Sequence, residues 1–103
     1  MILGVVVTDY RHAKTAYQVM REALNRKWSV KVFLTDDGVN MIKDHEFLDM
    51  AENEAAHSAF ICEHSVERYC KDVDLTKIEA FVVVGGQYQN AELVHNSERV
   101  LVF

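Results

Sequence analysis

Near the start of the chain, residues 3–34 read LGVVVTDYRHAKTAYQVMREALNRKWSVKVFL. Two short, mostly apolar runs, Leu3–Val7 and Val30–Leu34, enclose a longer amphipathic segment. Its apolar residues recur at spacings of three and four, the period of a helix with one buried face: Ala13, Ala16, Tyr17, Met20, Leu24 and Trp28. Continuous apolar runs are typical of strands covered on both faces of a sheet. The stretch therefore predicts a strand, a helix and a second strand.

The same alternation continues to the end of the chain. Three further apolar runs have strand length: Ala59–Cys62, Phe81–Val84 and Val100–Phe103. Helical patterns lie around 47–55, from about residue 65, and at 87–95, where we expect Ala91 and Val94 to face inward. Strands separated by helices imply right-handed crossovers and a parallel sheet. We predict an α/β fold, a three-layer α/β/α sandwich with a mainly parallel five-stranded sheet, formed as a single domain over residues 1–103.

Composition and charge narrow the classes of function. The chain has 103 residues, of which 50% are hydrophobic and 26% charged, as in a globular domain. Its formal net charge is −5 and it has no extended Lys/Arg cluster, which argues against direct nucleic-acid binding. The first residues lack a basic region and a cleavage site, and the apolar run is too short to span a membrane. We therefore expect a cytoplasmic protein with no membrane association and two free thiols.

Cys62 is the sharpest candidate for chemistry. Ligands of parallel sheets bind beyond the carboxyl ends of the strands, and Cys62 ends the third predicted strand there. A helix N-terminus and the imidazolium of His64, two residues on, would both lower the pKa of its thiol. The neighbouring Glu63 would raise that pKa. Free cysteine also commonly ends a buried strand as an inert residue, so both interpretations stay open.

Other residues at this edge are predicted to assist or to be structural. Arg11 and His12 follow the first strand and could stabilise an anionic sulfur group. Gly85 and Gly86 follow the fourth strand and would let backbone amides approach a ligand closely. Cys70 shares the apolar stripe of the third helix, so we predict a core residue too distant from Cys62 for a disulfide.

Metal and anion sites are weaker alternatives. The set His57, Cys62 and His64 matches no usual zinc-ligand spacing and lacks a fourth ligand. The segment Asp36–Gly38 has paired carboxylates that could hold Mg²⁺, although Asp-Gly is first a turn signal. A small-anion or nucleotide site in the loops after the first and fourth strands also stays open.

Four segments, in their order and spacing, carry a family resemblance: Val32–Val39, Phe60–Cys62, Val82–Gly86 and Ser97–Phe103. Together with the first strand and helix they resemble the DsrE/DsrF/DsrH family, which includes the Tus proteins of tRNA sulfur relay. The resemblance covers essentially the whole chain. It implies a sulfur carrier or sulfurtransferase in which a cysteine at the position of Cys62 holds sulfane sulfur as a persulfide and passes it to a partner protein.

The resemblance also implies partners: sulfur donor and acceptor proteins, and further subunits in a homo- or hetero-oligomer. It requires no metal or organic cofactor. In this interpretation His64 would favour the thiolate, while His12, Arg11, Gly85 and Gly86 would line the pocket. The alternative is a non-catalytic oligomeric binding or assembly subunit of the same fold, in which Cys62 is buried and inert.

Overall fold

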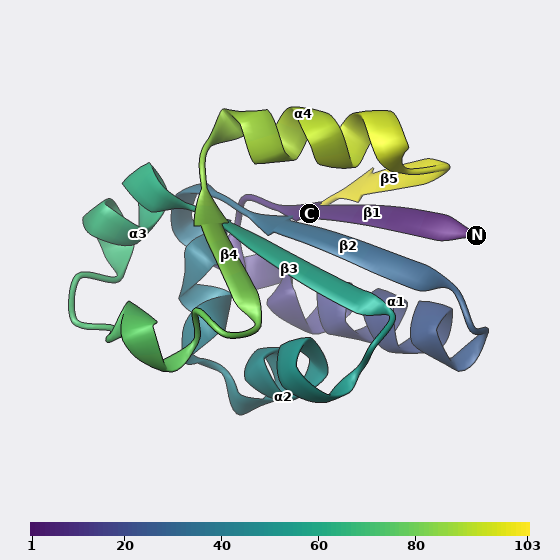
Figure 1. The fold of residues 1–103 in the computed structure, drawn as a ribbon, viewed down its shortest axis with the longest axis horizontal. Coiled ribbons are helices and arrows are strands. Elements are labelled where there is room, and N and C mark those ends of the chain that lie inside the picture. The colour runs from purple at the N-terminus through teal and green to yellow at the C-terminus, as the bar shows by residue number, and fades with distance from the viewer.

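A parallel sheet organises the chain in the computed structural model, which describes residues 1–103 (Figure 1). Its five strands are β1 (Ile2–Val7), β2 (Ser29–Leu34), β3 (His57–Cys62), β4 (Val82–Gly85) and β5 (Arg99–Val102). They lie in the order β4-β3-β2-β1-β5, and every neighbouring pair is parallel. The α/β class and the five-stranded parallel sheet predicted from the sequence are confirmed.

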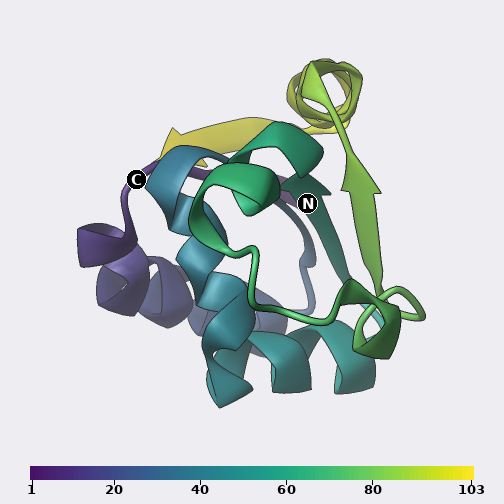
Figure 2. The ribbon, with the colours of Figure 1, turned by 90° about the vertical axis from the view of Figure 1, so that its left-hand side faces the viewer.

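Helices cover both faces of this sheet. The α-helices are α1 (Ala13–Asn25), α2 (His45–Asn53), α3 (Glu63–Tyr69) and α4 (Gln87–Asn96), and the 3-10 helices are η1 (Tyr10–His12), η2 (Asp36–Lys43) and η3 (Leu75–Lys77). Figures 1 and 2 show α1 and α2 on one face and α4 on the other. The connection from β4 to β5 runs back across the sheet, so a right-handed crossover places α4 opposite α1. None of these helices combines the length and the apolar character that crossing a membrane requires.

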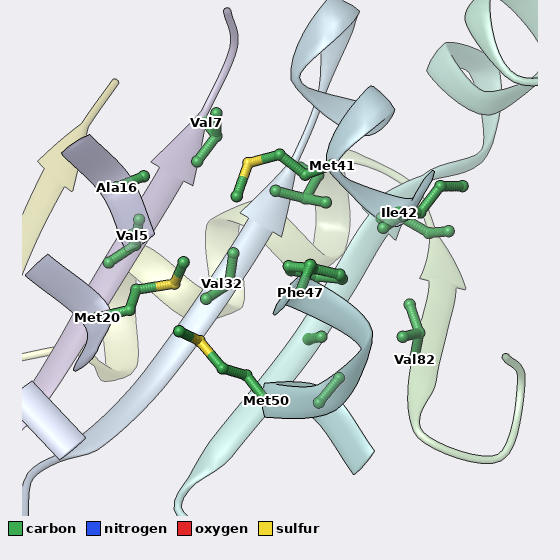
Figure 3. Close-up of a cluster of buried hydrophobic side chains, with 14 of the residues drawn as sticks. Val5, Val7, Ala16, Met20, Val32, Met41, Ile42, Phe47, Met50 and Val82 are labelled. Atoms are coloured by element: carbon green, nitrogen blue, oxygen red, sulfur yellow. The ribbon is translucent and has the colours of Figure 1, made fainter. Parts of the chain in front are cut away.

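The larger core fills the space between the sheet and α1, α2 and η2. Figure 3 shows Met20 of α1 and Phe47 and Met50 of α2 gathered over the sheet with Val5 and Val32. All five of these side chains are fully buried. The strands contribute apolar side chains to both faces, which explains why their sequences read as continuous apolar runs rather than alternating ones.

The orientation of α4 differs from the prediction. Leu93 is its buried residue, whereas Ala91 and Val94, predicted to face inward, are exposed. The cause is Gly4 of β1, on which α4 sits closely. A Cβ atom at Gly4 would lie 2.8 Å from Cδ2 of Leu93 and 2.6 Å from Oγ of Ser97. The missing side chain therefore sets which face of α4 points toward the sheet.

The segment after β2 is a helix rather than the turn that Asp-Gly suggested. It forms η2, and its Gly38 lies directly against the end of β1. A Cβ atom at this position would collide with the backbone carbonyl oxygen of Val7. Glycine is required here by the close approach of two backbone segments.

Candidate functional site around Cys62

Cys62 lies at the junction between β3 and α3, as the sequence predicted. It is the last residue of β3 and immediately precedes the first residue of α3. Its side chain points toward α4 and packs with Val6, Phe33 and Leu93 in a small apolar cluster. Only 5% of Cys62 is exposed, and it lines none of the five main surface clefts. Neither cysteine of the chain forms a disulfide.

The hydroxyl groups of Ser65 and Thr35 lie on the polar side of Cys62 and influence its thiol. Ser65, in the first turn of α3, is buried, and its hydroxyl accepts the backbone N–H of Asp36 at 2.8 Å. The same hydroxyl lies 3.4 Å from Oγ1 of Thr35, which directly follows β2. Because the Ser65 oxygen already accepts a hydrogen bond from Asp36, its own proton is free to be donated.

These donors decide the ionisation of the Cys62 thiol. Burial by itself raises its pKa, because it disfavours the charged thiolate. The hydroxyl and backbone N–H of Ser65, the hydroxyl of Thr35 and the backbone N–H of His64 act in the opposite direction and outweigh burial. The pKa of Cys62 is therefore held below its ordinary value, so the thiolate, the reactive form of cysteine, is favoured.

An unusual backbone conformation lies beside this site. Asp36 has a φ of 49°, in the left-handed region that few residues other than glycine adopt. Its N–H is the one that Ser65 accepts, and that hydrogen bond ties the strained residue to α3. The segment after β2 and the first turn of α3 are thus fixed to each other next to the thiol.

Gly85, the last residue of β4, and Gly86, which follows it, lie at the same edge of the sheet as Cys62. Gly85 is paired with Cys62 in the register of β3 and β4. A Cβ atom at Gly85 would lie 2.6 Å from Cγ of Gln89, so the Gln89 side chain covers this position. Gly86 precedes α4, and a Cβ atom there would meet nothing within 4 Å. The structure therefore brings Gly85 to Cys62 and leaves open space at Gly86.

The structure places Arg11 and His12 elsewhere. The Arg11 guanidinium pairs with the Asp9 carboxylate at 2.7 Å and otherwise extends into solvent. The cleft that it borders, of about 530 Å³, is lined by residues of η1, α1 and the start of α2, and Cys62 is not among them. His12 is exposed. Neither side chain is assembled with the thiol in this structure.

Sequence reasoning named His64 for its ring but did not find Ser65 and Thr35. The His64 side chain is exposed, and its contribution to the thiol pKa comes from its backbone N–H. Two features of the sequence could have identified Ser65 and Thr35. The third residue of a helix faces back toward the residue that precedes the helix, which relates Ser65 to Cys62. Thr35 follows the strand that neighbours β3, so the two strand ends meet at one edge.

No arrangement of side chains in the structure supports either of the metal sites considered from the sequence. Nowhere does the structure bring together three or more His, Cys, Asp or Glu side chains in a group that could hold a metal ion. Asp37 accepts the backbone N–H of Tyr10, which joins the segments after β1 and β2. His57 faces the opposite core, where its ring packs edge-on against Phe47.

The sequence matches no model of a known protein family, and no curated protein matches it.

Proposed function

We propose that this protein carries sulfane sulfur as a persulfide on Cys62 and passes it to a partner protein. The observation that supports the proposal best is the set of donors from Ser65, Thr35 and His64, which lowers the pKa of a thiol that burial alone would keep neutral. The resemblance of four ordered sequence segments to the DsrE/DsrF/DsrH family points to the same chemistry. Donor and acceptor proteins, an oligomeric assembly and a cytoplasmic location belong to this proposal.

The proposed relay consists of two balanced thiol exchanges. The Cys62 thiolate attacks the outer sulfur of a donor persulfide, so a new sulfur–sulfur bond forms and the donor leaves as a thiolate. An acceptor thiolate then attacks the outer sulfur on Cys62, and Cys62 leaves as a thiolate. The net change transfers one sulfur atom and needs no external oxidant or reductant. The donors around Cys62 favour it both as nucleophile and as leaving group, because each role involves the thiolate.

Access to the sulfur requires movement of its apolar cover. Cys62 contacts Leu93 of α4, and the two side chains belong to the same buried cluster. A shift of α4 away from the end of β3 would open this contact. The open position at Gly86, immediately before α4, gives the helix a hinge with a small residue and free space beside it.

Sulfur uptake measured by mass spectrometry tests the proposal. The protein is incubated with polysulfide or with a persulfurated cysteine desulfurase, and the intact mass is followed. We expect wild type and Cys70→Ala to gain the mass of one sulfur atom, and Cys62→Ser to gain none. Cys70→Ala is the matched control because it removes the other thiol. Equal uptake by Cys62→Ser and wild type would refute the proposal.

A non-catalytic assembly subunit is the second candidate function. The observation that favours it is the near-complete burial of Cys62 among Val6, Phe33 and Leu93. Alkylation by iodoacetamide, followed at each thiol near neutral pH, separates the two candidates. Fast labelling of Cys62 alone supports the relay, whereas equally slow labelling of Cys62 and Cys70 supports the assembly role.

A further inference from the structure

Gly85 leaves a place beside Cys62 that no side chain of β4 occupies. The two residues are paired in the register of β3 and β4, and paired residues of neighbouring parallel strands point to the same face of a sheet. Cys62 faces α4, where it packs with Leu93. A side chain at position 85 would therefore lie on the α4 face, about 4.8 Å from the side chain of Cys62. Because residue 85 is glycine, another residue can use this place.

Gln89 of α4 fills the place over Gly85. The chain turns from the end of β4 directly into α4, so the first turn of the helix lies next to Gly85 (Figure 1). A Cβ atom at Gly85 would lie 2.6 Å from Cγ and 3.2 Å from Nε2 of Gln89. The carboxamide of Gln89 is therefore separated from the Cys62 side chain by roughly one strand spacing.

The side-chain amide of Gln89 is available to a ligand. Within α4, Asn90 donates a hydrogen bond to Gln87, and Asn96 donates one to Glu92. Gln89 takes part in neither of these bonds, although its carboxamide has two N–H donors. The contacts between side chains of the helix thus leave this donor group unused.

Gln89 also lies between the thiol and a surface cleft. The cleft has a volume of about 300 Å³, and its lining includes Gln89, Phe60 and Leu93. Leu93 belongs to the buried cluster of Cys62, and Phe60 packs against that cluster. The Gln89 side chain is partly exposed, so it can move without unpacking the core. A small sulfur species in the cleft would meet Gln89 before it reached Cys62.

A persulfide on Cys62 needs space for a second sulfur atom and a donor for its charge. The outer sulfur would lie about 2 Å from the Cys62 sulfur. Val6, Phe33 and Leu93 pack against the thiol, whereas the place over Gly85 holds only the flexible side chain of Gln89. A persulfide is more acidic than its parent thiol, so the outer sulfur is readily anionic and is stabilised by an N–H donor.

We propose that Gln89 binds the transferred sulfur: when Cys62 holds a persulfide, the outer sulfur lies over Gly85 and accepts a hydrogen bond from the Gln89 carboxamide. This role rests on the proposed function and names the residue that holds its cargo. Ser65 and Thr35 act on the inner sulfur, which is the thiolate before loading. Gln89 acts on the outer sulfur, which exists only after loading.

A Gln89→Met variant tests this role in the empty and the loaded protein. Methionine has nearly the volume of glutamine but no N–H donor, so the place over Gly85 stays covered. The Cys70→Ala protein, in which Cys62 is the only thiol, serves as the reference and the background. Both proteins are loaded with polysulfide, and iodoacetamide labelling is followed by intact mass across a range of pH. A labelled persulfide is heavier than a labelled thiol by one sulfur atom, so the two forms are read separately.

The loaded and empty forms should respond differently. Below the midpoint of its pH profile, the Gln89→Met persulfide should label about fivefold more slowly than the reference, because loss of one hydrogen bond leaves less of the anion. At high pH, where both persulfides are anionic, the rates should converge. Labelling of the empty Cys62 thiol should not change, because its pKa is set by Ser65, Thr35 and the backbone of His64.

Two further substitutions sharpen the comparison. Gln89→Glu places a negative charge next to the outer sulfur and should slow labelling of the persulfide more than Gln89→Met does. Gln18→Met is the matched control, because Gln18 is exposed on α1, the helix on the other face of the sheet. It should label as the reference does in both forms.

The outcomes distinguish this role from the relay itself. A reference protein that takes up no sulfur at Cys62 would overturn the relay, and the role of Gln89 with it. Normal loading with the same persulfide profile in Gln89→Met and the reference would overturn the role of Gln89 alone. Equal slowing of the empty and loaded forms would also overturn it, because Gln89 would then act through access or packing rather than on the outer sulfur.

Discussion

The two faces of the sheet differ in the size of their cores, and each core contains one cysteine. The face covered by α1 and α2 has a cluster of 23 buried residues that includes Cys70, whereas the α4 face has a cluster of four that includes Cys62. Both thiols are nearly inaccessible, at 0% exposure for Cys70 and 5% for Cys62. Burial alone would thus predict the same behaviour for both.

The pKa values of the two thiols nevertheless shift in opposite directions. Burial raises the pKa of Cys70, and its thiol contacts only acceptors, the carbonyl oxygen of Val39 and Oδ1 of Asn40, each at 3.7 Å. The pKa of Cys62 is lowered because donors from the first turn of α3 and from Thr35, directly after β2, outweigh the effect of burial. The comparison teaches that the polar groups beside a buried thiol decide its ionisation: donors lie near Cys62, and acceptors lie near Cys70. Four substitutions test this contrast.

The largest expected effect is on stability, in the large core. Phe47→Ala should lower the free energy of unfolding by about 4 kcal/mol, because Phe47 is fully buried and its loss leaves a cavity. Phe60→Ala is the matched control, since Phe60 is only partly buried beside the small cluster. Denaturant unfolding measures both. Equal losses for the two variants would contradict the difference in core size.

The second prediction concerns His57, which lies in the same large core. Burial lowers the pKa of His57 to about 4, and neither ring nitrogen has a hydrogen-bond partner. The unfolded chain, with a histidine pKa of about 6.5, binds the proton more readily between these values. Stability should therefore fall as the pH drops from about 6.5 to about 4, by about 3 kcal/mol from this residue alone.

His57→Leu removes this titration, because leucine keeps the apolar contacts and binds no proton. The free energy of unfolding of both proteins, measured by denaturant across the pH range, should diverge progressively below about pH 6.5. At neutral pH the variant should be as stable as wild type or more so, since it buries no unpaired nitrogen. Parallel pH profiles for the two proteins would show that His57 is not held neutral by burial.

The strands and their parallel pairing were predictable from the sequence, because continuous apolar runs separated by an amphipathic helix allow few other arrangements. The position of Cys62 followed from the same pattern. The orientation of α4 did not, since its own apolar spacing is weak and Gly4, distant in sequence, decides which residue is buried.

The surroundings of Cys62 were predictable only in part. Helix geometry relates Ser65 to Cys62. The hydrogen bond that orients Ser65 comes from the N–H of Asp36, which has a left-handed backbone conformation, and no local sequence pattern predicts that conformation. Arg11 follows the first strand, as expected, yet its neighbour Asp9 binds it locally at 2.7 Å. The ion pair with Asp9 therefore holds Arg11 away from Cys62, although the order of the strands alone predicted that Arg11 lies at the site.

The third prediction concerns the cover of the small core. Leu93→Ala should cost about 2 kcal/mol of unfolding free energy, at the low end for such a truncation because few buried residues surround it. It should also speed iodoacetamide labelling of Cys62, since Leu93 packs against that thiol. Cys70 is the internal control and should stay protected. Unchanged labelling of Cys62 would show that Leu93 does not limit access.

The smallest expected effect distinguishes the influence of hydrogen-bond donors on the pKa of Cys62 from the influence of burial. Ser65→Ala removes the hydroxyl that lowers the pKa of Cys62 and leaves the apolar neighbours in place. The pKa should therefore rise toward the ordinary value of a cysteine thiol. Labelling of Cys62 near neutral pH should then slow several-fold, while at high pH, where both proteins are thiolates, the rates should converge.

That convergence is the decisive part of the measurement, because a loss of access would slow labelling at every pH. Ser65→Thr keeps the hydroxyl and should retain the low pKa, whereas Cys70 should not respond to either variant. If Ser65→Ala leaves the pH profile of Cys62 unchanged, the backbone N–H groups of His64 and Ser65 alone account for its ionisation. The opposite pKa shifts of Cys62 and Cys70 would then depend on the start of α3 directly after Cys62, and not on the Ser65 side chain.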